Sequence, residues 1–348
     1  MGKEAAKKVG YSILVIITII IAIITIIGGL YPNPNHSYFL VYIAIGMPAV
    51  LLFNLLIAIY WSFRWRFWAI VPIIAILSNW AFLSAMFQFN STNKSAYDLK
   101  VATYNVHSFN NDYSGYSAKK IANFMQDSNV GILCMQEYSS IGNFNLDSLN
   151  LTFNEYYTHS IIPRNNKGTR VAIYSKYPII NSKYISFKDS HNCAMYCDIK
   201  HDNTTIRIFN LHLQSTNFNQ DIAIARKQNI DASGAIDIIE SSLLSNAKKR
   251  TSQASFIAKL IQKSPYPVIL CGDFNAMPST YEYHTIAQLL NDGFIECGSG
   301  YGYTYRNLLK LMRIDYVFTS SKIIGKRYYS ASKVWSDHNP VLMEMSLK

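Results

Sequence analysis

One stretch of the chain reads Val268-Ile269-Leu270-Cys271-Gly272-Asp273, a short apolar run that ends on a carboxylate. A β-branched run of this length is typical of a buried strand, and the acidic residue marks the point where the strand stops. The same pattern recurs in Ile132-Leu133-Cys134-Met135-Gln136-Glu137. Two buried strands that each end on an acid predict a sheet core with carboxylates gathered at one edge.

Working outward, further apolar runs alternate with amphipathic segments. The predicted strands are 100–105, 131–136, 170–175, 194–200, 204–213, 267–271, 314–319 and 341–345. Helices are expected at 117–128, within 220–245, at 251–262 and at 280–290, and His201-Asp202-Asn203 is a hairpin turn signal. Hairpin-linked strands with helices between them predict an α+β sandwich, two stacked sheets with helices outside.

The first 87 residues have a different composition. Three stretches, 11–30, 38–61 and 67–87, contain no charged residue, and each exceeds the roughly 18 apolar residues of a membrane span. We therefore expect a membrane anchor of three transmembrane helices over 1–87, a polar linker over 88–97 and a soluble domain over 98–348. Because no ionisable group lies within a span, these helices are expected to anchor the chain to a lipid bilayer rather than to transport ions.

The charges that flank the spans predict their orientation. The loop 31–37 carries no Lys or Arg, whereas the opposite ends of the spans carry Lys3, Lys7, Lys8, Arg64 and Arg66. Positive flanks stay in the cytoplasm. The chain is thus predicted to be a multi-pass protein of the cell (inner) membrane, with residues 98–348 on the extracytoplasmic or periplasmic side.

Charge and cysteine usage add weaker constraints. The net charge is +11, of which residues 1–87 contribute +4 and the remainder +7. A basic soluble part favours nucleic acid or anionic lipid as a partner, although solvated lysines explain it equally well. The five cysteines show no CxxC spacing. Cys193 and Cys197 would stand about 13 Å apart on one strand, beyond disulfide reach, so buried thiols are expected.

Polar residues cluster where the predicted strands end. They are Asn105, Glu137, His212, Asp273, Asn275, Asp315, Asp337 and His338. Each alone is more often a turn residue, but several carboxylates at one edge need a cation to hold them together. Oxygen ligands with little sulfur favour Mg²⁺ or Mn²⁺.

The order of these residues resembles a known family. Tyr104-Asn105, Gln136-Glu137, Leu211-His212, Gly272-Asp273-Phe274-Asn275, Arg313-Ile314-Asp315 and Ser336-Asp337-His338 occur as in the endonuclease/exonuclease/phosphatase superfamily, the deoxyribonuclease-I-like group. The resemblance covers about 98–348. It implies a four-layer α/β/β/α sandwich, a metal-assisted attack of water on a phosphate ester, and a membrane-anchored bacterial member of the superfamily.

The same resemblance implies a role for each position. Glu137 matches the principal Mg²⁺ ligand, with Asn105 nearby, and Asp337 matches a further carboxylate of the metal site. The catalytic set would comprise Asp273, which orients or deprotonates water, Asn275, which contacts phosphate, His338, which holds the scissile phosphate, Asp315, which orients His338, and His212, which binds phosphate or acts as an acid.

Two departures from the family pattern narrow the function. Abasic-site repair members usually place a tyrosine at the position of His212 and an aspartate at that of His107, so DNA repair is disfavoured. His107 is expected to be either a site residue or a satisfied edge histidine. The basic run 248–250 could face a membrane or only solvent, and the Gly- and Tyr-rich stretch 298–305 could contact substrate or only pack.

The expected function is Mg²⁺-dependent hydrolysis of a phosphodiester, by a nuclease or by a phosphodiesterase acting on a phospholipid head group. No obligate protein partner is predicted. The alternative from another class is an inactive membrane-anchored binding or signalling module of the same fold. Because the chain keeps Asp273, Glu137 and His338, we favour the active enzyme.

Overall fold

The computed structural model describes residues 2–31, 33–36, 38–91, 96–140, 144–163, 170–216, 218–228 and 230–348. The chain divides into two compact units. The first contains residues 1–84 with 278–281, and the second contains 85–277 with 282–348. The prediction of a linker over 88–97 is wrong at its start, because residues 88 and 89 belong to a strand of the second unit. Residues 92–95 of this linker lie outside the described residues.

The first unit consists of apolar helices. They are α1 (Gly2–Gly28), α2 (Tyr38–Ile45), α3 (Met47–Phe63), the 3₁₀ helix η1 (Phe67–Ala69), α4 (Ile70–Leu77) and α5 (Trp80–Met86). Helix α1 is long and apolar enough to cross a membrane. The second and third expected spans are each broken: α2 and α3 meet at 70°, and Phe67–Leu77 and Trp80–Met86 meet at 63°.

Of the three expected transmembrane helices, the first is therefore confirmed as one continuous helix, and the other two stretches each form a bent pair. Each break has a local cause. Pro48 lies in the first turn of α3, where it has no N–H to extend a helix from α2. At the second break, the Asn79 side chain donates to the Ala75 carbonyl at 3.0 Å and so competes with the backbone ladder. If each bent pair counts as one span, the total is three.

Buried polar side chains pack these helices together. The Asn54 amide donates to Thr25 Oγ1 at 2.6 Å, and the Trp61 indole donates to Thr18 Oγ1 at 2.9 Å. Such interhelical hydrogen bonds are typical of helices packed in an apolar medium. They give Asn54 a packing role, as expected for an anchor.

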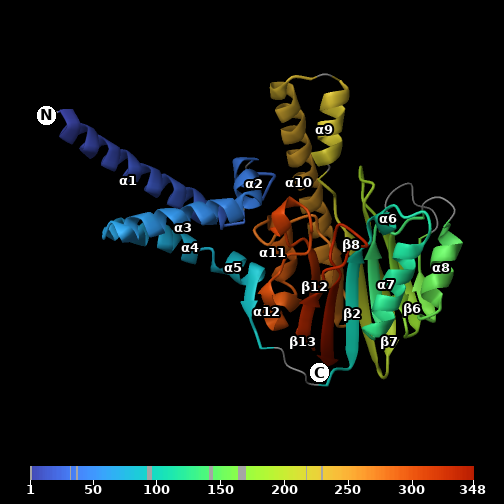
Figure 1. Ribbon diagram of the computed structural model, residues 1–348. Coiled ribbons are helices and arrows are strands. Elements are labelled where there is room, and N and C mark those ends of the chain that lie inside the picture. Colours follow the sequence, from blue (N-terminus) through green and yellow to red (C-terminus); the bar gives the residue numbers. More distant parts are fainter. Residues whose placement is uncertain are drawn as a thin grey trace. The chain divides into compact units, whose positions relative to one another are not determined.

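The second unit contains two six-stranded mixed sheets (Figure 1). The strands of the first run in the order β13 (Ile323–Ser330), β14 (Val341–Leu347), β2 (Leu99–Asn105), β3 (Ile132–Gln136), β5 (Val171–Ser175) and β4 (His159–Ile161). Those of the second run β10 (Asn291–Asp292), β12 (Asp315–Thr319), β9 (Val268–Asp273), β8 (Thr204–His212), β7 (Cys193–His201) and β6 (Ile179–Ser186). A two-stranded sheet pairs β1 (Phe87–Phe89) with β11 (Ser299–Tyr301).

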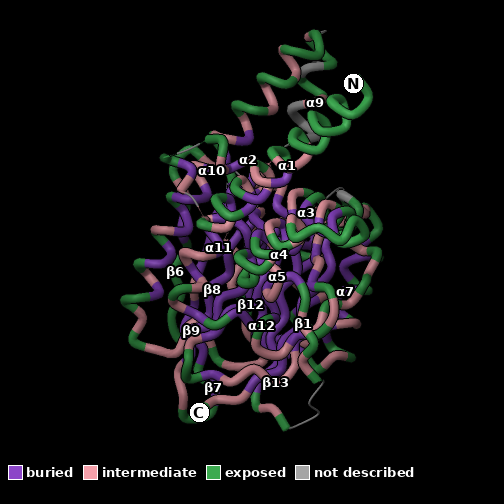
Figure 2. Tube along the Cα trace, turned by 90° about the vertical axis from the view of Figure 1, so that its left-hand side faces the viewer, coloured by how far each residue is buried: buried purple, intermediate pink, exposed green. Residues whose placement is uncertain are grey.

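Helices cover both outer faces. Their bounds are α6 (His107–Asn110), α7 (Tyr116–Asp127), α8 (Leu146–Asn154), α9 (Phe218–Lys227), α10 (Ala232–Gln262), α11 (Tyr281–Ala287), α12 (Gly293–Cys297) and η2 (Leu308–Lys310). One buried cluster lies between the sheets, a second packs α10 and α11 on the β8–β9–β12 face, and a third packs α7 and α8 on the β2–β3–β5 face. In Figure 2 the buried parts of the chain, drawn in purple, are accordingly concentrated in the central strands of the sheets. The expected α/β/β/α sandwich is present.

All eight predicted strands are found. The edge strands β6 and β13 were not predicted, because exposed edge positions carry polar and charged residues that hide the alternation. The two helices expected within 220–245 and at 251–262 are joined, since α10 runs unbroken from Ala232 to Gln262. The cysteines are free, as expected.

A buried polar contact joins the two sheets. Asn210 of β8 accepts from the Gln136 side chain of β3 at 2.7 Å. Its own amide donates to the carbonyls of Met135 and Ala172 at 3.0 and 2.9 Å. Since both side chains are fully buried, these bonds fix the register of one sheet on the other directly beneath the strand ends.

We predict that Asn210→Ala lowers the free energy of unfolding by about 2–4 kcal/mol, because it leaves buried donors and acceptors without partners. The measurement is urea unfolding of the detergent-solubilised chain. Asn203→Ala, in the exposed β7–β8 turn, is the control and should change the value by less than about 0.5 kcal/mol. Equal effects of the two substitutions would contradict the inter-sheet role.

Candidate functional site

The sequence-predicted polar residues meet at one edge of the sandwich because of strand direction. β2 and β3 are parallel and end at Asn105 and Gln136, while β8 and β9 are parallel and end together at His212 and Asp273. β12 runs antiparallel to β9 and begins at Asp315, opposite Asp273. The carboxyl ends of the two parallel pairs therefore present their last side chains at the same edge.

The backbone turns sharply where three strand-end residues leave the sheets. Glu137, Asn275 and His107 have φ values of 52°, 49° and 45°. This left-handed region is unfavourable for residues with a Cβ, and such conformations cluster at functional sites. The turn after β3 is held by the Glu137 carbonyl, which accepts from the Ser108 N–H at 3.1 Å.

The Asn105 side chain links carboxylates of the two sheets. Its amide nitrogen donates to Glu137 Oε1 at 3.1 Å and to Asp273 Oδ2 at 2.9 Å. Its oxygen accepts from the His107 N–H at 3.0 Å, which fixes which end of the amide faces the acids. In this arrangement Asn105 restrains the Glu137 and Asp273 side chains by donating to both.

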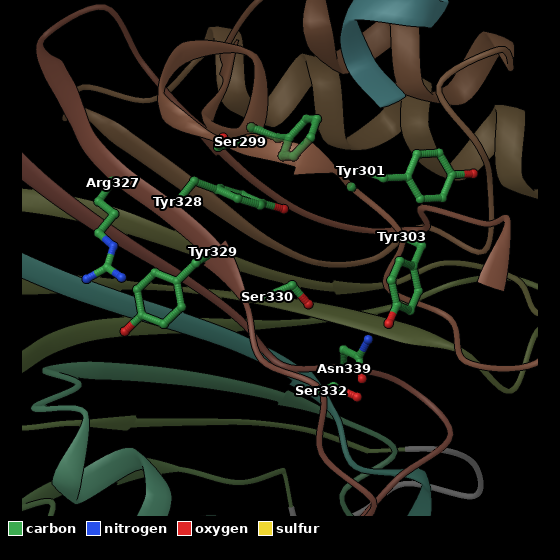
Figure 3. Close-up of a pocket in the computed structure, with 11 residues that line it drawn as sticks. Ser299, Tyr301, Tyr303, Arg327, Tyr328, Tyr329, Ser330, Ser332 and Asn339 are labelled. Atoms are coloured by element: carbon green, nitrogen blue, oxygen red, sulfur yellow. The ribbon is translucent and has the colours of Figure 1, made fainter. Parts of the chain in front are cut away.

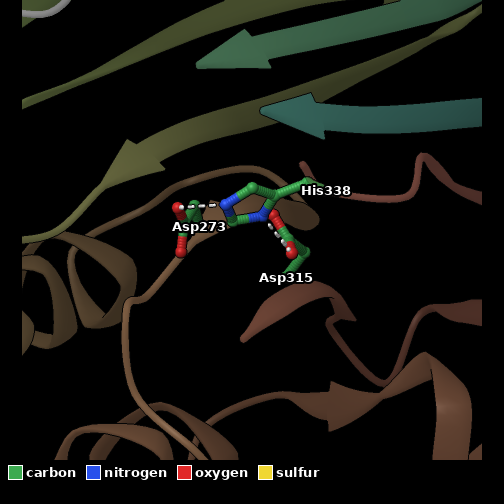
Figure 4. A group of neighbouring side chains, drawn as sticks. All are labelled: Asp273, Asp315 and His338. Carbon is green, nitrogen blue, oxygen red and sulfur yellow. Dashed lines mark hydrogen bonds and ion pairs between the residues drawn. The ribbon is translucent and has the colours of Figure 1, made fainter. Parts of the chain in front are cut away.

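Asp315, His338 and Asp273 form a buried line (Figure 4). His338 Nδ1 lies 2.8 Å from Asp315 Oδ2, and its Nε2 lies 3.9 Å from Asp273 Oδ2. The carboxylate of Asp315 thus holds the ring so that Nε2 faces Asp273. The Tyr305 ring packs edge-on against His338, with centroids 5.0 Å apart.

Burial and mutual charge shift the pKa values of this line. Burial alone would lower the pKa of His338, but the carboxylates of Asp315 and Asp273 outweigh it and raise that pKa to about 10. Burial, together with the neighbouring Asp315, raises the pKa of Asp273 to about 7. His338 is therefore a cation at neutral pH, next to a carboxyl group that exchanges a proton near neutrality.

His212 and Asn275 complete the buried side of the site. His212 Nε2 lies 3.6 Å from Glu137 Oε1 and 3.8 Å from Asp273 Oδ2. Burial lowers the pKa of His212, so its ring is neutral at pH 7. The Asn275 N–H donates to Asp273 Oδ1 at 2.7 Å, and its side chain donates to the Leu213 carbonyl at 3.1 Å.

Glu137 and Asp337 form the more open side. About a quarter of each side chain is exposed, and His107 Nδ1 lies 3.9 Å from Glu137 Oε2 and 3.1 Å from Asp337 Oδ1. The hydrogen bond that His107 donates to the Asp337 carboxylate is the largest influence on the pKa of His107 and raises it. His107 therefore lies beside two of the predicted site residues, with its Nδ1 paired to Asp337.

This open pair fits a hard divalent cation. The partly exposed carboxylates of Glu137 and Asp337 both lie near His107 Nδ1, and oxygen donors of this kind suit Mg²⁺ or Mn²⁺. Asp273, Asp315 and His338 also bring ligand atoms within 4.8 Å of one another. In that group His338 Nδ1 also lies 2.8 Å from Asp315 Oδ2, while Asp315 Oδ1 is buried without a hydrogen-bond partner.

The structure adds residues that sequence reasoning missed. Thr304 Oγ1 accepts from the N–H groups of Ile314 and Asp315 at 3.0 and 3.1 Å, and Ser336 Oγ donates to the Asn105 carbonyl at 2.7 Å. A hydroxyl beside a motif is too common a signal to have found them. Arg250, expected on a solvated face, is instead buried and donates to the Gln214 carbonyl at 3.0 Å, behind His212.

The tyrosines of the Gly- and Tyr-rich stretch 298–305 lie in two different places. Tyr305 packs on His338, whereas Tyr301 and Tyr303 line a hollow of about 250 Å³ beside β13, with Tyr329 on the opposite wall (Figure 3). Asn339, which directly follows His338, also lines this hollow.

We predict that Asp315→Asn lowers the pKa of His338, because losing the adjacent carboxylate leaves burial to dominate. A raised pKa means that protonated His338 stabilises the fold: the contribution is fully present below about pH 6.5 and is lost as the pH rises through about 10. NMR titration of the ¹³C-labelled His338 ring measures the shift. Asp202→Asn, which removes an exposed carboxylate beside His201, is the control. An unchanged His338 titration in Asp315→Asn would contradict the assignment.

Solved structures with the same fold are numerous. An endonuclease/exonuclease/phosphatase from Bacteroides vulgatus is 18% identical, with a TM-score of 0.53, covering 72% of this chain and 99% of its own. Bacteroides thetaiotaomicron mannosyl-6-phosphatase is 17% identical, with a TM-score of 0.51 and coverage of 72% and 100%. D. rerio TDP2 complexed with single strand DNA product is 14% identical, with a TM-score of 0.51 and coverage of 71% and 98%. These likenesses show the fold.

No curated protein matches the chain. Residues 11–86 match a family model described only as a domain of unknown function. Residues 102–338 match the model of the Endonuclease/Exonuclease/phosphatase family, a span that contains every residue of the site from Asn105 to His338. The chain therefore belongs to the endonuclease/exonuclease/phosphatase family.

Proposed function

We propose that this protein is a membrane-anchored, Mg²⁺-dependent phosphoesterase that hydrolyses a phosphodiester. The observation that carries the proposal is the pairing of Asp273 with His338. A carboxyl group with a pKa of about 7 faces an imidazolium with a pKa of about 10 across 3.9 Å. General-base catalysis works best with a pKa near the working pH, and a fixed cation stabilises a phosphate anion.

The residues divide the reaction between them. Asp273 would orient a water molecule and accept its proton at Oδ2. His338, held by Asp315, would donate from Nε2 to a phosphate oxygen and stabilise the charge that develops there. Because Asn105 and the Asn275 N–H each donate to Asp273, the carboxylate has a fixed direction before substrate arrives.

Glu137 and Asp337 would hold the metal ion, with Asn105 keeping Glu137 in place. When bound, the divalent cation neutralises the non-bridging phosphate oxygens and polarises the phosphorus toward attack. The neutral His212 ring would donate a hydrogen bond to the phosphate from the buried side, and the Asn275 side chain would contact it nearby.

Two substrate classes remain open, nucleic acid and phospholipid head groups. The fold itself does not separate them, since its similar structures include TDP2 with a single strand DNA product and a mannosyl-6-phosphatase. The positive charge of the soluble part is compatible with either negatively charged substrate class. A membrane anchor, which would keep the site near a bilayer, favours the phospholipid substrate.

The inactive binding module is the second class of function. It would require the loss of a proton acceptor, a metal carboxylate or the phosphate-binding histidine. In this chain the Asn105 amide instead donates to both Glu137 and Asp273, and His338 lies next to Asp273. This convergence supports catalysis.

The decisive experiment is a substrate panel with the full chain in detergent and Mg²⁺. It compares single- and double-stranded DNA, RNA, sphingomyelin, phosphoinositides and bis-nitrophenyl phosphate. We predict hydrolysis of at least one diester and a loss of about 10²–10⁴-fold in kcat for Asp273→Asn, which cannot accept the proton. Metal affinity, measured by calorimetry, should change little in this variant. Near-wild-type turnover in Asp273→Asn would overturn the mechanism, and no hydrolysis across the panel would favour the binding module.

Glu137→Gln should have a different signature. It preserves size but removes a ligand charge, so we predict weaker Mg²⁺ binding and partial recovery of activity at high Mg²⁺ concentration. Titration of activity against Mg²⁺ is the measurement, and Glu155→Gln, at an exposed position after α8, is the matched control. A Mg²⁺ dependence equal to that of the control would remove Glu137 from the proposed metal site.

We also propose that the second unit lies on the extracytoplasmic side of the cell membrane, with the apolar unit crossing three times. The support is the flank asymmetry, Lys3, Lys7, Lys8, Arg64 and Arg66 against none in 31–37. Alkaline phosphatase fused after Lys348 should then be active, because it matures only outside the cytoplasm. An inactive fusion, with an active cytoplasmic reporter at the same place, would reverse the orientation.

A further inference from the structure

We propose that residues 85–89, which directly follow the apolar unit in sequence, are a positioning element of the catalytic unit and not a passive tether. We name them the junction segment. Its effect on turnover rests on the proposed phosphoesterase function, whereas its binding to the catalytic unit does not. The sequence predicted a linker from residue 88, so no pattern in the chain had signalled this role.

The junction segment is paired like a strand of the domain, and its first two residues, Ala85 and Met86, are buried. Phe87, Gln88 and Phe89 pair antiparallel with Tyr301, Gly300 and Ser299. The Met86 carbonyl accepts from the Gly302 N–H at 2.9 Å, and Asn90 donates to the Ile295 carbonyl at 3.0 Å. Ala85 is fully buried in the cluster under α10 and α11. A tether would leave these backbone groups to water.

A buried arginine connects the junction segment with the Asp315 strand. Arg313 is fully buried and makes a two-pronged ion pair with Asp292 at 2.6 and 2.7 Å. Its Nη1 also donates to the Ala85 carbonyl at 2.9 Å. A buried guanidinium needs an acceptor for each of its donors. Moving the Ala85 carbonyl away would therefore leave Arg313 without one acceptor, and Arg313 lies only two residues before Asp315.

The second connection runs through the loop after β11. Gly302, bonded to Met86, is followed by Thr304, whose hydroxyl accepts from the Asp315 N–H at 3.1 Å. Thr304 also accepts from the Asn339 N–H at 2.7 Å through its carbonyl, and the next residue, Tyr305, packs on the His338 ring. The junction segment therefore supports both residues of the Asp315–His338 pair. It supports Asp315 through Arg313 and Thr304, and His338 through the loop that contains Thr304 and Tyr305.

The consequence is a defined coupling between the junction segment and the site. Displacing the junction segment would release the β11 loop and one Arg313 contact, which lets the His338 ring move relative to Asp273. Misplacements of about 1 Å at a reacting centre can cost about a hundredfold in rate. Among the described residues, the side chains of Glu137 and Asp337 interact with Asn105 and His107 rather than with the segment, so substrate and metal affinity should change much less than turnover.

The test uses the full chain in detergent, with a site-specific protease sequence inserted between residues 93 and 94. After cleavage, the fragment that begins at residue 94 should stay bound to the fragment that carries the junction segment, with kcat unchanged. In Gln88→Pro, whose proline disrupts the β1–β11 pairing, cleavage should separate the fragments. The freed fragment should lose about tenfold to a hundredfold in kcat on bis-nitrophenyl phosphate, with KM and the Mg²⁺ requirement nearly unchanged.

Ala96→Pro, at an exposed position outside β1 and β2, is the matched control and should behave as the wild type. Ser299→Pro on the partner strand replaces Gln88→Pro if that variant fails to fold, as judged by thermal unfolding. A freed fragment with wild-type kcat would overturn the positioning role, and a Gln88→Pro chain that stays associated after cleavage would overturn the pairing as its basis. Absence of activity in the uncleaved wild type would instead contradict the proposed function, while the association result would still decide the binding.

Discussion

The site depends on one constraint, the crowding of acidic side chains at an edge where two sheets meet. Asn105 reduces the repulsion between these side chains, because its amide donates to both Glu137 and Asp273, which follow or end strands of different sheets. The remaining repulsion is met by protonation: the pKa of Asp273 is raised to about 7 and that of His338 to about 10. The same crowding that costs stability thus creates a proton acceptor beside a fixed cation.

The surrounding fold holds this arrangement through buried polar contacts. Asn210 and Gln136 fix the sheets directly below the site, and Arg250 holds the loop after His212 through the Gln214 carbonyl. Arg313, paired with Asp292, holds the approach to Asp315. Such groups are costly to bury unless every partner is present. The hydrogen bonds that these side chains make hold the strand ends in place, which is what a preorganised site requires.

The apolar unit follows different physics. Its helices are packed through Thr, Asn and Trp side chains rather than by charge, and two of its three apolar stretches bend where Pro48 or Asn79 interrupts the ladder. The segment between this unit and the first catalytic strand is shorter than composition suggested, because Phe87–Phe89 pairs as a strand with Ser299–Tyr301. Strand β1 therefore belongs to the second unit.

Local pattern determined much of this protein. Apolar runs that end in Asn, Glu, His or Asp located eight strands and the edge where Asp273, Glu137 and His338 meet, because strand period and strand ends are properties of neighbouring residues. Tertiary structure alone decided the rest. The burial of Arg250, the continuity of α10 and the strand β1 all depend on partners far away in sequence, such as Gln214 or Gly302. A hydrogen bond over more than 200 residues, like that from Arg313 to Ala85, leaves no periodic trace in either segment.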